Sequence, residues 1–154
     1  MKWKVEKWHH LKEVLKSPDG VIVIDYRFPY GTIPGTKIGY RTDARTAYLP
    51  NNQKGKLALS MLILAFERKL TFQVGKSLTT GEENVIVWAG IHHKTSEKGG
   101  VHGYPDPNYF DNLFGELKDR GIMPEDVDPN PKETGQIEVT HEKPKSSSSA
   151  WSFW

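Results

Sequence analysis

Hydrophobic residues recur along the chain at two spacings, which predict its helices and strands. Apolar positions at steps of three and four across residues 5–16 predict an amphipathic N-terminal helix within residues 1–19. Residues 53–69 are apolar around most of the helical circumference, so this segment is expected to form a buried, central helix. A last helix is predicted from the Asp-Pro pair at 106–107 to Arg120, because this pair favours a helix start and the glycine that follows favours its end.

Strands are predicted where residues are β-branched or alternate between apolar and polar. Residues 21–28 begin with four consecutive β-branched residues, which is typical of a strand buried on both faces. Extended chain is expected across residues 37–49. Residues 70–75 and 85–88 predict two strands of a hairpin with a long connecting loop.

The C-terminal part of the chain has a different composition. Residues 123–154 are rich in Pro, Glu, Lys and Ser and contain few apolar side chains, so a disordered tail is expected. The tail ends in Trp151, Phe153 and Trp154, which would either dock on a partner, fold back on the domain or remain exposed. The predicted organisation is therefore an N-terminal helix at 1–19, one domain at 20–122 and a tail at 123–154.

Composition excludes several classes of protein. The chain has 154 residues, of which 36% are hydrophobic, which suits one globular domain. It contains no cysteine, which excludes disulfides, thiolate zinc sites and a cysteine nucleophile. A net charge of +2 with scattered basic residues disfavours nucleic acid and membrane surfaces as partners. The longest apolar stretch, at 57–66, is about half a membrane span, so we expect a cytoplasmic or nuclear protein.

Histidines are concentrated in one glycine-rich stretch. His92, His93 and His102 lie within eleven positions of one another together with several glycines, and histidine exchanges protons near neutral pH, for example with a sugar hydroxyl. The alternative is two surface histidines and one buried, hydrogen-bonded histidine. Zinc binding is disfavoured, because adjacent side chains at a strand end point in opposite directions and no cysteine completes the ligand set.

Two further features carry polar chemistry. Glu116 lies at the margin of the apolar stripe of the last predicted helix, where a carboxylate can orient a histidine and raise its basicity; an exposed helical glutamate is the alternative. The turn Thr79-Thr80-Gly81 offers hydroxyls and backbone amides to a phosphate or ribose. The motifs of Rossmann, P-loop, hydrolase and zincin sites are absent.

Several segments resemble the Deltex C-terminal domain when they are taken in order. The resemblance covers about residues 20–121 and is carried by ARTAYLP from Ala44, RKLTFQVG from Arg68, TTGE from Thr79, VW from Val87, IHHKT from Ile91 and HGYPDPNY from His102. It implies an α+β domain, and with the predicted elements we expect a curved antiparallel sheet packed against the helix at 53–69. It also implies ADP-ribose and NAD as ligands, held in a groove lined by the histidine-bearing segments, and membership of a family of ubiquitin E3 ligases.

The resemblance assigns roles to residues at matching positions. His102 is expected to act as general base on a ribose hydroxyl that accepts ubiquitin, and Glu116 is expected to support it. The expected groove residues are His92, Tyr104, Thr79, Thr80 and Gly81, with Arg45 and Trp88 as supporting residues. Implied partners are ADP-ribose, NAD or an ADP-ribosylated protein, and a ubiquitin-loaded E2 recruited through a separate RING domain; neither a covalent cofactor nor a metal is expected.

Two departures from the family pattern weaken these expectations. A chain without cysteine cannot contain a RING domain. Leu78 stands where a small hydroxyl residue usually precedes the Thr-Thr-Gly turn, and the family's longer loop is reduced to residues 32–35, which alters one edge of the groove. The alternative function is therefore a non-catalytic protein-interaction module.

Overall fold

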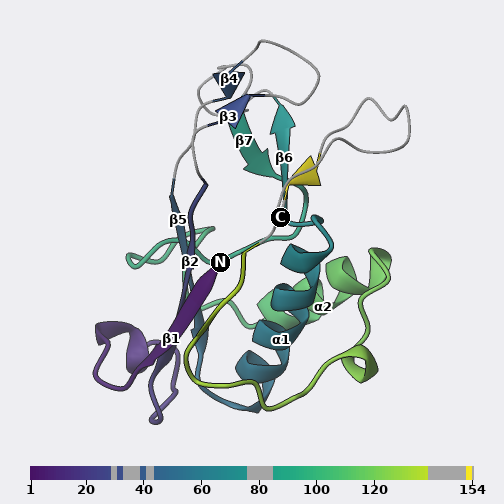
Figure 1. The fold of residues 1–154 in the computed structure, drawn as a ribbon. Helices are drawn as coiled ribbons and strands as arrows, with labels where there is room; N and C mark the ends of the chain where they lie inside the picture. The colour runs from purple at the N-terminus through teal and green to yellow at the C-terminus, as the bar shows by residue number, and fades with distance from the viewer. Residues whose placement is uncertain (29–30, 33–38, 41–43, 76–84, 139–151, 154) are drawn as a thin grey trace.

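The structure is a computed structural model. It describes residues 1–28, 31–32, 39–40, 44–75, 85–138 and 152–153. The elements run in the order β1 (Lys2–Glu6), η1 (His10–Lys12), β2 (Val21–Tyr26), β3 (Gly31–Thr32), β4 (Gly39–Tyr40), β5 (Arg45–Pro50), α1 (Gln53–Glu67), β6 (Phe72–Gly75), β7 (Val85–Trp88), α2 (Tyr109–Asp119), η2 (Pro124–Asp126), β8 (Gly135–Gln136) and β9 (Ser152–Phe153). This is the predicted α+β arrangement (Figure 1).

The largest sheet is antiparallel and has the strand order β5-β2-β1-β8. Its inner strand β2 pairs with β5 over its whole length and with β1 from Val21 to Asp25. The first four residues of β2 are buried, as their β-branched side chains predict. Two smaller antiparallel sheets are present: β3 pairs with β4, and β6 lies between β7 and β9. Among the described residues the strands thus form three antiparallel sheets, and the largest of them packs against α1, as predicted.

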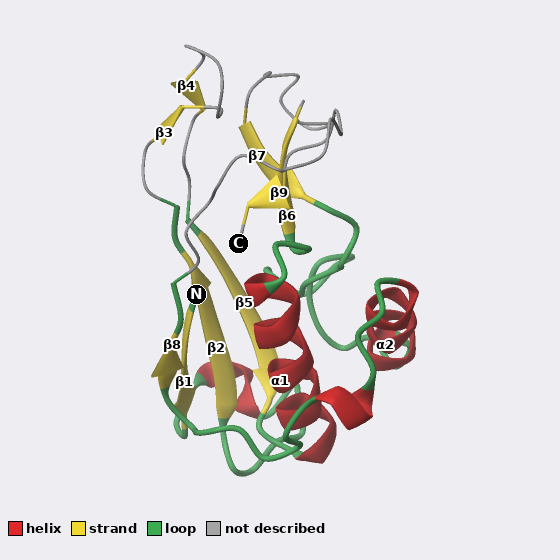
Figure 2. Cartoon of the chain, turned by 45° about the vertical axis from the view of Figure 1, so that its right-hand side comes forward, coloured by secondary structure: helices red, strands yellow, loops and turns green. Residues whose placement is uncertain are grey.

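Helix α1 lies between the large sheet and α2 (Figure 2). Its position explains why it is apolar on several sides, since it buries residues toward both neighbours; these include Ala58, Leu59, Met61, Leu62, Ala65 and Phe66. Asn52 caps the helix, because its side-chain Oδ1 accepts the backbone N–H of Gly55 at 2.8 Å. The prediction of a central helix at this place is confirmed.

The hairpin strands and the last helix form within the segments that the sequence predicts, with later starts for β6 and α2. Strands β6 and β7 pair antiparallel from Phe72 opposite Trp88 to Gly75 opposite Val85. Helix α2 begins at Tyr109 instead of Pro107, because the Asp106 carboxylate accepts the backbone N–H of Asn108 in a turn before the helix and also binds Lys94.

The predicted N-terminal helix is wrong. Residues 2–6 form β1, which pairs with β2, and only the short 3-10 helix η1 follows. Met1 and Trp3 are both buried and lie two positions apart, which is the spacing of a strand. Trp8, which the helical pattern placed on the buried face, is 89% exposed. The segment thus has a two-residue spacing ahead of Glu6 as well as the three-and-four spacing through residue 16, and residues 2–6 form the strand that pairs with β2.

The predicted disorder of the tail is wrong for residues 123–138. This segment crosses α1, where Ser60 Oγ donates to the Asp128 carbonyl at 2.5 Å, and Trp3 Nε1 donates to the Lys132 carbonyl at 2.9 Å. It then adds β8 to the free edge of β1. Val127 and Ile137 pack against the core as partly buried side chains, and hydrogen bonds to the backbone of the segment supply its other contacts. Further along, the backbone of β9 pairs with β6; residues 139–151 and 154 lie outside the described part.

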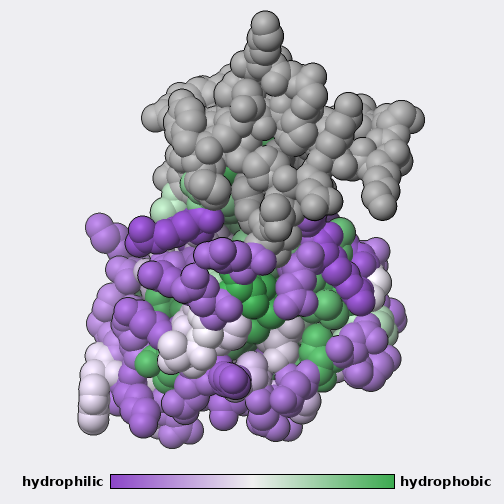
Figure 3. Space-filling view, in the orientation of Figure 1, coloured by the Kyte–Doolittle hydropathy of each residue, from purple (hydrophilic) through white to green (hydrophobic). Residues whose placement is uncertain are grey.

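The surface seen in Figure 3 is mainly hydrophilic, with hydrophobic side chains visible between polar ones. No helix among the described residues is both long and apolar enough to cross a membrane.

Candidate functional site

An open pocket of about 500 Å³ lies between α2 and the loop segments that carry the histidines. Residues 92–94 and 101–102 form one wall, and α2 forms the other. All three histidines of the glycine-rich stretch line this pocket together with Glu116. The structure therefore brings together the residues that the sequence singled out for acid-base chemistry.

Glu116 is bound to His92. Its Oε2 accepts the Nδ1–H of the His92 ring, and its Oε1 accepts the His92 backbone N–H at 3.0 Å. Tyr109, about two α-helical turns before Glu116, donates its hydroxyl to the His92 carbonyl at 2.9 Å. With Nδ1 engaged, the other ring nitrogen, Nε2, is left as a proton acceptor, and the His92 side chain is 73% exposed. The structure thus orients a carboxylate and a histidine, as predicted, but the histidine is His92 and not His102.

His93 points in the opposite direction and is buried. Its Nδ1 donates to the Ile91 carbonyl at 2.9 Å, and its Nε2 accepts the Tyr26 hydroxyl at 2.7 Å. Its ring stacks on Trp88 with the ring centres 4.4 Å apart. Burial lowers the pKa of His93 to about 4, so the imidazole is neutral at physiological pH. The expected opposite orientation of the two adjacent histidines is confirmed.

Lys94 is a buried cation beside the same pocket. It is only 4% exposed, and its Nζ donates to the Asp106 carboxylate at 2.8 Å and to the Val101 carbonyl at 2.9 Å. The hydrogen bond from Lys94 holds the pKa of the Asp106 carboxyl below its usual range. This ion pair joins the segment before the glycine-rich loop to the segment after it.

His102 lies at the far end of that loop. It is exposed, and its carbonyl accepts the backbone N–H of Ser96 at 2.8 Å. No hydrogen bond to its imidazole is found within the described part of the chain. The ring is consequently placed in the pocket by the backbone of the loop alone.

The remaining predicted residues lie elsewhere or fall outside the described chain. Tyr104 is buried and donates its hydroxyl to the Tyr48 carbonyl at 2.6 Å, so that hydroxyl is used within the fold. Trp88 belongs to an aromatic cluster with His93 and Phe72. The Arg45 guanidinium donates to the carbonyl of Ile86 in β7 at 3.4 Å. Thr79, Thr80 and Gly81, with Leu78 and most of the shortened loop, lie outside the described residues.

The charge of the pocket restricts what it can bind. Four carboxylates line it, from Asp106, Asp111, Glu116 and Asp119, against the single ammonium of Lys94. A pyrophosphate among these groups would be repelled, whereas neutral hydroxyl groups can donate hydrogen bonds to them. The pocket is therefore suited to the hydroxyl-bearing part of a ligand.

Sequence reasoning missed two residues that shape the site. Lys94 and Arg120 are both charged side chains that bind backbone carbonyls; Arg120 donates to the carbonyls of Ala89 and Glu116 at 2.9 and 2.8 Å and so joins the end of β7 to α2. No local pattern distinguishes them from surface charges, because the partners that tie them into the site, Asp106 for Lys94 and Ala89 for Arg120, lie 12 and 31 positions away.

Comparison with known proteins identifies the fold. The family model of the Deltex C-terminal domain matches residues 2–122. The E3 ubiquitin-protein ligase DTX1 of Xenopus laevis is 50% identical over 94 residues, which are 60% of this chain and 15% of that protein. The probable E3 ubiquitin-protein ligase DTX3 of Pongo abelii is 45% identical over 109 residues, which are 67% of this chain and 31% of that protein.

The matched region thus spans less than a third of the length of these relatives. The family match begins at residue 2, so it includes the N-terminal strand that sequence analysis had placed outside the domain. Together with the α+β architecture, this match shows that the chain belongs to the Deltex C-terminal domain family.

Proposed function

We propose that the pocket binds ADP-ribose or NAD and presents a ribose hydroxyl for conjugation to ubiquitin, with a RING domain on another chain or segment supplying the ubiquitin-loaded E2. The observation that carries this proposal is the oriented Glu116 and His92 pair, with His102 in the same pocket, in a chain of the Deltex C-terminal domain family. Relatives named as E3 ubiquitin-protein ligases support the link to ubiquitin.

The charge of the pocket favours one orientation of the ligand. The ribose would lie among the carboxylates, where its hydroxyls find acceptors, and the pyrophosphate would lie outside the pocket. Arg45 on β5 is a candidate for the pyrophosphate, because a guanidinium matches a pair of phosphate oxygens.

The proposed reaction is an acyl transfer. The ribose hydroxyl oxygen attacks the carbonyl carbon of the thioester that joins ubiquitin to the E2; a C–O bond forms, the C–S bond breaks, and the E2 sulfur leaves as a thiolate. The hydroxyl proton passes to a histidine acting as general base. His102 has this role in the proposal, while Glu116 acts by holding His92 and by accepting a hydrogen bond from the ribose.

Binding is tested by calorimetric titration with ADP-ribose, NAD and ADP. ADP lacks the second ribose of ADP-ribose and serves as the control ligand. Removing the charge in Glu116→Gln is expected to weaken ADP-ribose binding by about tenfold or more, since hydrogen bonds to charged groups contribute roughly 1.5–3 kcal/mol. ADP binding is expected to be unchanged, and Glu125→Gln on the exposed η2 is the control variant.

Transfer is tested with a RING domain from a relative added to the chain, the E2, ubiquitin and ADP-ribose. We expect a ubiquitin product that hydroxylamine cleaves, as it cleaves esters. His102→Gln is expected to lose most of this product while retaining ADP-ribose binding. If His92→Gln loses ubiquitin transfer while His102→Gln transfers at the full rate, the general base is His92 and not His102. If the chain binds neither ADP-ribose nor NAD, the proposal fails and the interaction-module alternative takes its place.

A further inference from the structure

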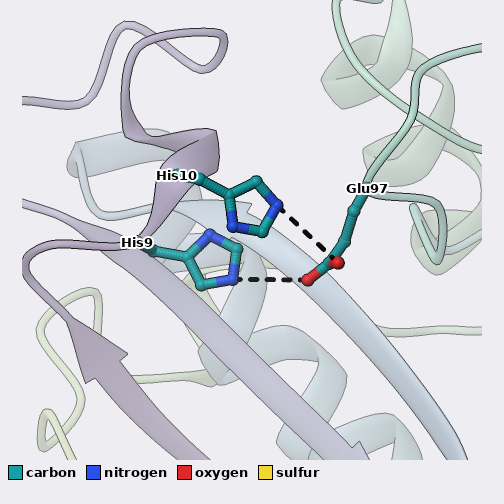
Figure 4. A group of neighbouring side chains, drawn as sticks. All are labelled: His9, His10 and Glu97. Atoms are coloured by element: carbon teal, nitrogen blue, oxygen red, sulfur yellow. Dashed lines mark ion pairs between the residues drawn. The ribbon is translucent and has the colours of Figure 1, made fainter.

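A second cluster of ionisable side chains lies outside the pocket, between the N-terminal segment and the glycine-rich loop. His9 and His10 stack with ring centres 4.3 Å apart, and both face the carboxylate of Glu97 (Figure 4). His9 Nε2 is 3.5 Å from Glu97 Oε1, and His10 Nε2 is 3.7 Å from Oε2. The Tyr48 hydroxyl donates to Oε1 at 2.8 Å. We refer to His9, His10, Tyr48 and Glu97 as the latch.

The protonation of His9 decides what kind of site this is. The imidazole and carboxylate ligand atoms lie within 4.8 Å of one another, a spacing that a metal ion can span. However, His9 Nδ1 accepts the backbone N–H of Leu11 at 3.1 Å, so the neutral ring carries its proton on Nε2, toward Glu97. A metal at Nε2 would require that proton on Nδ1, directly opposite the Leu11 N–H. The cluster therefore directs the His9 Nε2–H toward the Glu97 carboxylate, 3.5 Å away, instead of presenting a free lone pair to a metal ion.

The latch is anchored in the core of the domain. Leu11, whose N–H fixes the His9 ring, is buried, and so is Tyr48 on β5. The His9 side chain is 8% exposed. Burial and the hydrogen bond to the Glu97 carboxylate raise the pKa of Tyr48, so its hydroxyl remains a donor. The Glu97 carboxylate thus faces two groups that the core of the domain holds, His9 and Tyr48, together with the exposed His10. His9 Nε2 also lies 3.8 Å from the Glu6 carboxylate.

Glu97 is adjacent to the residue that holds His102. Ser96 donates its backbone N–H to the His102 carbonyl at 2.8 Å, and Gly103 donates to Gly100 at 3.1 Å, which closes the loop between them. The His102 imidazole has no hydrogen bond of its own within the described chain. A shift of the loop at Glu97 is therefore transmitted to His102 through Ser96.

We propose that the latch positions the loop so that His102 enters the pocket, which makes His9, His10 and Glu97 positioning residues for the ribose-directed chemistry. This inference rests on the proposed function, because its effect is read at His102. Removing the Glu97 carboxylate is expected to leave ligand contacts intact and to misplace one reacting group; displacements of this kind lower reaction rates strongly.

The test compares Glu97→Ala, Glu97→Gln and the neighbouring control Lys98→Ala. We expect Glu97→Ala to lower ubiquitin transfer to ADP-ribose by at least about tenfold, with the dissociation constant of ADP-ribose changed by less than about twofold. Glu97→Gln keeps an acceptor for the Tyr48 hydroxyl and is expected to recover part of the rate. Lys98→Ala is expected to transfer at the rate of the unmodified chain.

A measurement independent of activity separates this inference from the proposed function. The imidazole resonances of His102 in NMR spectra are expected to shift or broaden in Glu97→Ala and to remain unchanged in Lys98→Ala. If the unmodified chain shows no transfer but these resonances shift, the proposed function fails and the positioning stands. Transfer by Glu97→Ala at the full rate, or His102 resonances that do not move, overturns the positioning. Stoichiometric zinc binding that Glu97→Ala abolishes would replace the latch with a metal site.

Discussion

The buried histidine predicts how the stability of the domain depends on pH. His93 remains neutral in the folded protein because burial lowers its pKa to about 4, whereas the histidine of the unfolded chain has its ordinary pKa of about 6.5. Below pH 6.5 the unfolded chain binds a proton that the folded protein does not bind, so acidification favours unfolding. This loss begins as the pH falls through 6.5 and stops below about 4, where the folded protein also binds the proton.

The magnitude follows from the difference between the two pKa values. Each unit of difference corresponds to about 1.36 kcal/mol. Between pH 7.5 and pH 4.5, one group with pKa values of about 6.5 and about 4 lowers the free energy of unfolding by roughly 2.5 kcal/mol. That is a large share of the roughly 5–15 kcal/mol that stabilises an ordinary domain.

The assay is urea unfolding at several pH values, with His93→Phe as the comparison. Phenylalanine keeps an aromatic ring against Trp88 but cannot titrate, and it leaves the Tyr26 hydroxyl without its partner. The variant is therefore expected to be less stable at pH 7.5 but to lose about 2.5 kcal/mol less than the unmodified chain on acidification to pH 4.5. Parallel pH profiles of the two proteins, or a His93 imidazole that titrates near pH 6.5 by NMR, would refute the reasoning.

Two further predictions concern stability. A Cβ at Gly55 would lie 1.7 Å from the backbone carbonyl oxygen of Pro50. Gly55→Ala is therefore expected to lower the free energy of unfolding, measured with urea, by about 3 kcal/mol. A loss under about 1 kcal/mol would contradict this close approach. Trp3→Phe removes the hydrogen bond to the Lys132 carbonyl and is expected to lower the free energy of unfolding by about 1–2 kcal/mol. Proteolysis within residues 123–138 is expected to increase. Unchanged proteolysis would show that this bond does not hold the segment.

Long elements with one strong pattern were predictable from sequence. Helix α1 and the hairpin of β6 and β7 form at the predicted residues, because the burial that their side chains require is reflected directly in the pattern. The N-terminal segment was not predictable in this way. It contains both a helical spacing and a strand spacing, and the free edge of β2, which is distant in sequence, selects the strand.

The C-terminal segment shows a second limit of sequence reasoning. Residues 123–138 have few apolar side chains, yet the carbonyls of Asp128 and Lys132 accept hydrogen bonds from Ser60 and Trp3. Composition measures what a segment can bury by itself. It does not reveal donors that other elements offer to the backbone of that segment.

The arrangement of residues 92–94 explains why the composition of the site was predictable and its pairing was not. These three consecutive side chains bind three different parts of the fold: His92 binds Glu116 on α2, His93 binds Tyr26 on β2, and Lys94 binds Asp106 before α2. The segment has no regular secondary structure, so its conformation depends on these tertiary contacts. A change to any one partner is therefore expected to move the other two side chains of the segment. Measurements on variants of His92 or Glu116 should therefore include a variant of the buried Tyr26 as a control. This variant tests whether a change at the far end of the segment alters the site through His93.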